Sequence, residues 1–99
     1  MASFGKIAVL GGGSFGTALS NMIAENGHKV VLWMRSEENA RKCARSRENT
    51  RYLPGCLLDS RLEISSDLKA SLQDADVVFF SVPSKAFRKL ANKARGYIT

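Results

Sequence analysis

The amino-acid sequence predicts an α/β domain built around a doubly wound parallel sheet. Three observations support this: short apolar runs alternate with amphipathic stretches, a glycine-rich turn follows the first apolar run, and the apolar runs contain few polar residues. Strands without polar alternation are typical of sheets that helices cover on both faces. The 99 residues, 44% of them hydrophobic, suit one small globular domain and exclude collagen-like, low-complexity and disulfide-scaffold classes.

The first part of the chain predicts a strand, a helix and a second strand. Residues 6–10 form an apolar run that Gly11–Gly13 stops, which indicates a buried strand. Residues 15–25 follow as a helix that Asn26–Gly27 ends, and residues 30–34 are a second apolar run. In the helix, we expect the apolar residues at spacings of three and four to form the buried stripe. These residues are Phe15, Ala18, Leu19, Met22 and Ile23.

A capped helix and a loop come next. Ser36 can cap a helix over about 37–46, and Glu37 and Glu38 suit the positive end of its dipole. The apolar stripe of this helix is thin, so we expect the helix to lie at the periphery. The stripe consists of Ala40, Cys43 and Ala44. Residues 49–59, which contain a Pro-Gly pair, predict a loop.

The last part of the chain predicts two further strand–helix pairs. Residues 62–65 are a weak strand, and residues 67–72 are a short helix. Residues 77–82 form the most strand-like run of the chain; Pro83 stops this run, and Ser84 opens the last helix. The expected buried side of that helix consists of Ala86, Phe87, Leu90, Ala91 and Ala94.

Strands that alternate with helices in this way imply right-handed crossovers and parallel pairing. With the first strand in the centre, the predicted order is 3-2-1-4, part of a Rossmann-type sheet with three layers, α/β/α. The fourth strand would then be a long apolar edge, which native sheets avoid. We therefore expect the chain to be the N-terminal part of a larger domain of this type.

Basic residues concentrate in two segments of a chain whose net charge is +6. Residues 35–51 contain six bases and three acids, and residues 85–95 contain five bases and no acid. Such segments suit a polyanion, either a nucleic acid or a phosphorylated cofactor. For residues 85–95, we favour a solvated helix face. No aromatic-studded sheet or recognition-helix signature supports nucleic-acid binding.

Several classes of site and location lack their sequence signals. Cys43 and Cys56 are not spaced as a metal pair, and His28 is the single histidine, so we expect no metal site and no Cys/His nucleophile. Two unpatterned cysteines fit a reducing compartment, and we expect a cytoplasmic protein. No apolar run is long enough for a signal peptide or a membrane span.

The glycine-rich turn has the pattern G-x-G-x-x-G and lies between a predicted strand and a predicted helix. This context predicts a dinucleotide site. Gly11 permits the tight turn, Gly13 lets the backbone approach a pyrophosphate, and Gly16 lets the helix pack closely on the strand. The amides of Ser14 and Phe15 lie in the first helical turn, where they can point at phosphate. For the Phe15 ring, simple packing is the competing interpretation.

The end of the second strand bears on the choice between NADPH and NADH. Arg35 lies nineteen residues after Gly16, where an acid would favour the ribose hydroxyls of NADH. The guanidinium is suited to phosphate oxygens, so we predict that Arg35 and Ser36 contact a 2′-phosphate and that NADPH is preferred, with NAD(H) also accepted. Two alternatives stay open: Glu37 or Glu38 turns toward the ribose, or Arg35 is an exposed strand-end residue.

Five segments of the chain resemble the bacterial NAD(P)-dependent glycerol-3-phosphate dehydrogenases, in order and with natural spacing. They are residues 7–19, 26–33, 49–55, 74–78 and 82–84. The R-Y-L-P-G sequence that ends at Gly55 and the V-P-S sequence that ends at Ser84 are the most discriminating. Phe15 stands where many members have Trp or Tyr, and Arg35 matches a position that is basic or His in many bacterial members.

The resemblance implies an enzyme that reduces dihydroxyacetone phosphate to sn-glycerol 3-phosphate for phospholipid synthesis, with a helical substrate domain absent from this chain. The family's catalytic lysines and substrate-phosphate arginine lie beyond Thr99, so we predict no catalytic residue and expect cofactor binding without turnover. For the full-length protein we expect a homodimer. The cofactor-binding residues implied by the resemblance are Ser14, Phe15, Arg35, Tyr52, Ser81, Val82 and Pro83.

Other interpretations remain open. Tyr52 is equally suited to a packing aromatic that anchors its loop. The same N-terminal module occurs in other reductases, such as 3-hydroxyacyl and 6-phosphogluconate dehydrogenases, although the loop over residues 52–55 argues against them. A module that senses NADPH without turnover is a third possibility.

Overall fold

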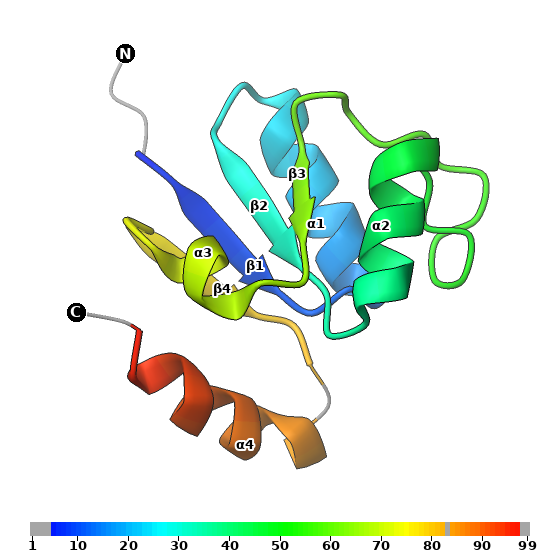
Figure 1. Cartoon of the computed structure of the whole chain (residues 1–99). Coiled ribbons are helices and arrows are strands. Elements are labelled where there is room, and N and C mark those ends of the chain that lie inside the picture. The colour runs from blue at the N-terminus through cyan, green and yellow to red at the C-terminus, as the bar shows by residue number, and fades with distance from the viewer. Residues whose placement is uncertain (1–4, 83, 98–99) are drawn as a thin grey trace.

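The computed structural model describes residues 5–82 and 84–97. These residues form strands and helices that alternate along the chain (Figure 1). The elements are β1 (Ile7–Leu10), α1 (Ser14–Glu25), β2 (Val30–Trp33), α2 (Glu37–Ser46), β3 (Glu63–Ser65), α3 (Leu68–Leu72), β4 (Val77–Phe80) and α4 (Ser84–Arg95). Every predicted strand and helix is therefore present, and the bounds that were predicted differ by at most two residues.

The strands form a parallel sheet in the order β3-β2-β1-β4. β1 is paired on both sides, and its last residue, Leu10, lies opposite Trp33 of β2 and Phe80 of β4. The carboxyl ends of these three strands are therefore level with one another at one edge of the sheet. The strand order confirms the predicted Rossmann-type fold.

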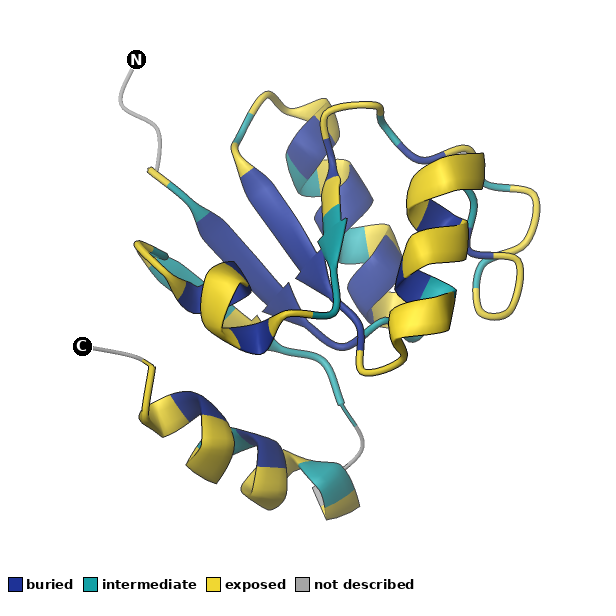
Figure 2. Cartoon of the chain, in the orientation of Figure 1, coloured by how far each residue is buried: buried dark blue, intermediate teal, exposed yellow. Residues whose placement is uncertain are grey.

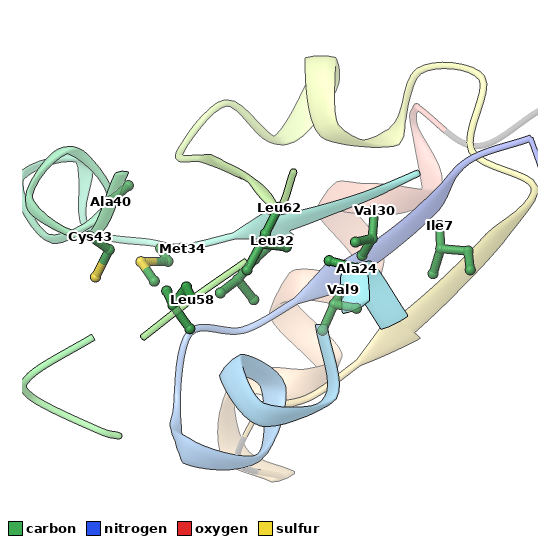
Figure 3. Close-up of a cluster of buried hydrophobic side chains, with 10 residues drawn as sticks. All are labelled: Ile7, Val9, Ala24, Val30, Leu32, Met34, Ala40, Cys43, Leu58 and Leu62. Carbon is green, nitrogen blue, oxygen red and sulfur yellow. The ribbon is translucent and has the colours of Figure 1, made fainter. Parts of the chain in front are cut away.

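Helices cover both faces of the sheet: α1 and α2 lie on one face, and α3 and α4 lie on the other (Figure 1). Successive strand residues point to opposite faces of the sheet, and helices cover both faces, so β1 and β2 are buried along their whole length (Figure 2). The core on the α1 and α2 face contains Ile7, Val9, Ala24, Val30, Leu32, Met34, Ala40, Cys43, Leu58 and Leu62 (Figure 3). The core on the other face contains Ala8, Leu10, Val31, Trp33, Leu68, Leu72, Leu90 and Ala94.

The predicted buried stripe of α1 is wrong for most of its residues. Phe15 is 71% exposed and Met22 is 54% exposed, Ala18 is also exposed, and Leu19 and Ile23 are half-buried. The buried face of the helix instead consists of Gly16, Thr17, Ser20, Asn21 and Ala24. The cause is the close approach of the helix to the glycine turn, where a Cβ on Gly16 would collide with the carbonyl oxygen of Gly11. Small side chains fit this contact, whereas Phe15 and Met22 face outward and Ile23 packs against the edge of the core.

The buried sides of α2 and α4 were predicted in part. In α2, Ala40 and Cys43 are buried and Ala44 is exposed. In α4, Leu90 and Ala94 are buried, whereas Phe87 is 46% exposed. The centroid of the Phe87 ring lies 5.2 Å from that of Phe80 in a T-shaped arrangement. Phe80 belongs to β4, which is an edge strand of the sheet that the described residues form.

Trp33 is the single tryptophan of the chain and the last residue of β2. Its indole Nε1 donates a hydrogen bond to the carbonyl oxygen of Ser66 at 3.0 Å, and the residue is 9% exposed. This bond ties the end of β2 to the segment between β3 and α3. The next residue, Met34, is held in the same way, because its amide donates to the Ser65 carbonyl oxygen at 2.8 Å.

No helix among residues 5–82 and 84–97 is long and apolar enough to cross a membrane. In the same part of the chain, no group of three or more His, Cys, Asp or Glu side chains is placed to hold a metal ion. Cys43 is buried and Cys56 is partly exposed, and both are free thiols. Burial raises the pKa of the Cys43 thiol.

Candidate functional site

A cleft of about 560 Å³ opens at the carboxyl ends of β1, β2 and β4. In doubly wound sheets, this is the edge at which ligands bind. The residues predicted from the sequence that line the cleft are Gly11, Gly13, Arg35, Ser36, Tyr52, Ser81 and Val82. Further residues line the cleft that were not predicted from the sequence, namely Gly12, Met34, Asn39, Arg51 and Ala86. The fold thus brings the glycine turn, the end of β2 and the 49–55 loop to one site.

Four predicted residues are absent from the described walls of the cleft. Gly16 is buried in α1, and the Phe15 ring projects into solvent. The Ser14 hydroxyl donates to the carbonyl oxygen of Tyr52 at 2.6 Å, so this side chain holds a loop. Pro83 lies outside the described residues. What Ser14, Phe15 and Gly16 offer to the cleft is therefore their backbone.

The glycine turn is shaped by two different constraints. Gly11 has a φ of +129°, and a Cβ there would collide with the carbonyl oxygen of Ser81, so the ends of β1 and β4 can meet only around a glycine. Gly13 has a φ of −74°, which any residue can adopt, and a Cβ there would meet no protein atom within 4 Å. No protein contact therefore accounts for the missing side chain at Gly13. The open space belongs to the cleft, which Gly13 lines.

The N-terminus of α1 has backbone amides without hydrogen-bond acceptors in the helix and the partial positive charge of the helix dipole. The Thr17 amide makes the first hydrogen bond of the helix, to the Gly13 carbonyl oxygen at 3.0 Å, which leaves the amides of Ser14, Phe15 and Gly16 without an acceptor inside the helix. No side chain caps this end, and its first turn contains no acid. By contrast, Ser36 caps α2, as predicted, and accepts a hydrogen bond from the Asn39 amide at 3.1 Å. The helix that faces the cleft can thus accept an anion.

Asn49 joins the loop after α2 to the glycine turn by hydrogen bonds. The residue is fully buried, and its Nδ2 donates to the Gly12 carbonyl oxygen at 2.8 Å and to Thr17 Oγ1 at 2.9 Å. Together with the Ser14–Tyr52 hydrogen bond, these contacts hold the loop against the start of α1. This role of Asn49 was not predicted from the sequence, although the residue begins one of the five segments that resemble the family. A single sequence gives no sign that a polar loop residue will be buried.

Tyr52 and its neighbour form one wall of the cleft. The residue is 40% exposed, so the Tyr52 ring is only partly packed against the protein. The guanidinium carbon of Arg51 lies 5.3 Å from the centroid of the Tyr52 ring, a cation–π contact. The loop is anchored instead through the backbone carbonyl of Tyr52. Both side chains are thus available to a ligand.

The described walls of the cleft carry positive charge from Arg35 and Arg51 and no carboxylate. The two acids that follow Ser36 are turned along α2: Glu37 pairs with Arg41 at 2.6 Å, and Glu38 pairs with Lys42 at 3.2 Å. Neither acid lines the cleft. The ion pairs found among the described residues also leave Arg35 and Arg51 uninvolved. The arrangement therefore suits a ligand with several negative charges.

A family profile described as NAD-dependent glycerol-3-phosphate dehydrogenase N-terminus matches residues 6–99. The chain belongs to this family. It is 58% identical over 93 residues to a glycerol-3-phosphate dehydrogenase [NAD(P)+] from Teredinibacter turnerae, covering 94% of this chain and 27% of that protein. It is 49% identical over 98 residues to the protein of the same name from Saccharophagus degradans, covering 99% of this chain and 27% of that protein.

The crystal structure of glycerol-3-phosphate dehydrogenase from Coxiella burnetii has the same fold. It matches this chain with a TM-score of 0.92 and 35% identity, over 97% of this chain and 30% of that one. This family member thus spans 27% of the length of the two curated relatives named above. The family resemblance inferred from the five sequence segments is confirmed.

Proposed function

We propose that the cleft of this glycerol-3-phosphate dehydrogenase family member binds NADPH in preference to NADH. We further propose that the chain is the cofactor-binding part of an enzyme that reduces dihydroxyacetone phosphate to sn-glycerol 3-phosphate. The family membership supports the reaction. The cofactor site is supported chiefly by one observation: the uncapped start of α1 lies behind Gly13, where the space for a side chain is empty of protein atoms.

The pyrophosphate of the cofactor fits this position. The amides of Ser14, Phe15 and Gly16 need acceptors, and the dipole of α1 favours a negative charge at its start. Gly13 allows the phosphate oxygens to approach the backbone closely. Asn49 holds the turn in this form through its hydrogen bonds to the Gly12 carbonyl oxygen and to Thr17 Oγ1. When bound, the reduced nicotinamide supplies the hydride for the reaction.

The adenosine end of the cofactor fits the end of β2. Arg35 offers a fork of N–H donors that suits the oxygens of a 2′-phosphate. Ser36 accepts the Asn39 amide with its Oγ lone pair, which leaves the hydroxyl hydrogen to donate to the same phosphate. With Glu37 and Glu38 paired along α2, no carboxylate on the described walls of the cleft repels that group. These features support a preference for NADPH.

The described walls of the cleft contain no lysine, histidine or carboxylate, the side chains that most often transfer a proton to a reduced carbonyl. We therefore expect the 99-residue chain to bind the cofactor without turnover. A cytoplasmic location and a homodimer of the longer enzyme stay predictions.

Calorimetric titration of NADPH and NADH into this chain tests the proposal. NADPH should bind more tightly, and Arg35→Ala should weaken NADPH binding about tenfold because it removes a charged partner of the phosphate, while the affinity for NADH changes little. Arg45→Ala is the matched control, since Arg45 is exposed on α2 and does not line the cleft. An unchanged ratio of NADPH to NADH affinity in Arg35→Ala would refute the role of Arg35.

The assay for reduction of dihydroxyacetone phosphate uses any longer product of the same gene. Turnover of this substrate by the longer product supports the proposed reaction. A longer product that binds NADPH but turns over a different carbonyl substrate favours another reductase, and one that binds NADPH with no reductase activity favours a sensing module.

A further inference from the structure

A second hollow, of about 370 Å³, adjoins the cleft and is lined by bases from α4. Its walls are formed by Arg35, Lys85, Ala86, Lys89, Leu90 and Lys93. Arg35 and Ala86 also line the cofactor cleft, so the two hollows meet at these residues. The end of β2 forms one side of this junction, and the start of α4 forms the other. We call the second hollow the basic groove.

The basic groove concentrates positive charge without compensation from acids. Lys85, Lys89 and Lys93 follow one another at intervals of four residues and therefore lie along one side of α4. All three are exposed, and no acidic side chain lines the groove. None of the three takes part in the ion pairs found among residues 5–82 and 84–97. Like charges at this spacing repel one another, so an anion bound between them would relieve the repulsion.

The position of Arg35 identifies which anion fits. This inference rests on the proposed function, which places the 2′-phosphate of NADPH at Arg35. Because Arg35 belongs to both hollows, a phosphate that it binds lies at their junction, opposite the first turns of α4. We propose that Lys85 and Lys89 complete the 2′-phosphate subsite from the α4 side, so that the preference for NADPH comes from both β2 and α4.

The geometry of α4 separates Lys93 from this subsite. The helix rises about 1.5 Å per residue, so Lys93 begins roughly 12 Å along the helix from Lys85, more than the width of a phosphate group. Ala86, which marks the boundary with the cofactor cleft, is next to Lys85 and distant from Lys93. Lys93 therefore carries the same charge as Lys85 and Lys89 and lines the same groove from the same helix, but it lies away from the junction. It provides a matched control within one element.

The test measures dissociation constants of the chain for NADPH and NADH, and for the fragments adenosine 2′,5′-bisphosphate and AMP. The double variant Lys85→Gln and Lys89→Gln should bind NADPH and the bisphosphate about tenfold more weakly, a modest loss because each exposed charge pair contributes little. Its affinity for NADH and AMP, which lack the 2′-phosphate, should change by less than about twofold. The variant Lys93→Gln should change NADPH binding by less than about twofold. The salt dependence of NADPH binding should also be shallower in the double variant than in the unchanged chain.

Three other results would refute the α4 subsite, the proposed function or both. If the unchanged chain binds NADPH and NADH but the double variant leaves their affinity ratio unaltered, the α4 subsite is refuted and the proposed cofactor site stands. If Lys93→Gln weakens NADPH binding as much as the double variant does, the subsite is refuted. The effect would then come from the overall positive charge of α4. If the unchanged chain binds neither dinucleotide, the proposed function is refuted, and the subsite with it.

Discussion

Replacement of Gly13 by aspartate should stabilise the free chain and, at the same time, weaken its binding of NADPH. Gly13 is the N-cap of α1 with extended backbone angles of −74° and −174°, a conformation that aspartate adopts as an N-cap. The new side chain would meet no protein atom at its Cβ, and its carboxylate could accept the unsatisfied amides of the first turn. Asp67 already does this for α3, where it accepts from the Ala70 amide at 3.0 Å.

The substitution should have two effects of opposite sign, a gain in stability and a loss of affinity for NADPH. A capping carboxylate in place of glycine contributes about 0.5 to 1 kcal/mol through its hydrogen bond and the helix dipole, which raises the melting temperature of a domain of this size by about 2 to 8 °C. In the complex, the same carboxylate faces the pyrophosphate. Two unit charges about 5 Å apart repel by about 3 kcal/mol at an effective dielectric constant of about 20, or roughly a hundredfold in the dissociation constant.

Thermal unfolding followed by circular dichroism measures the first effect, and calorimetric titration of NADPH measures the second. Gly13→Asn is the matched control, because asparagine caps a helix without a negative charge. It should weaken binding less than Gly13→Asp does. A folded Gly13→Asp chain that binds NADPH with an unchanged dissociation constant would show that the start of α1 does not hold the pyrophosphate.

Three further predictions concern stability and thiol chemistry. Gly16→Ala should destabilise the chain by about 3 kcal/mol in urea unfolding, since the added Cβ would collide with a backbone oxygen; an unchanged midpoint would contradict this contact. The Cys43 thiol, buried and with a raised pKa, should react with iodoacetamide at least about ten times more slowly than Cys56 near pH 8, and equal rates in mass spectrometry would contradict its burial. Hydrogen bonds from Arg61 lower the pKa of Asp59 to about 2, so its contribution to stability is present above the unfolded pKa and is lost as the pH falls from about 4 to 2. The stability of Asp59→Asn should therefore fall less than that of the unchanged chain between about pH 4 and pH 2. Identical acid unfolding curves for the two chains would argue against the Arg61 contact.

The features that the sequence predicted correctly depend on short stretches of chain. The runs at β1 and β2 are apolar at every position, which indicates burial on both faces without knowledge of their neighbours. Ser36 caps α2 through a bond that spans three residues. The strand order then follows from the alternation of elements and the handedness of their crossovers.

The features that the sequence did not predict depend on how distant segments approach one another. The apolar stripe of α1 has regular helical spacing, yet the packing face is set by the contact between Gly16 and the Gly11 carbonyl. Asn49 reaches the glycine turn from a loop more than thirty residues away in sequence. The junction between Arg35 and α4 likewise forms only in the folded chain. In the site, the sequence identified most of the cleft-lining residues but not the contacts that hold them.

The place of Trp33 gives the chain an intrinsic optical signal. Its indole is shielded, fixed to Ser66 and separated by a single residue from Arg35 on the cleft wall. Reduced nicotinamide absorbs light in the range where indole emits, so titration should quench the emission by energy transfer. Since no other tryptophan contributes, the fluorescence of each variant reports on this one location, without labels and at concentrations far below those that calorimetry needs.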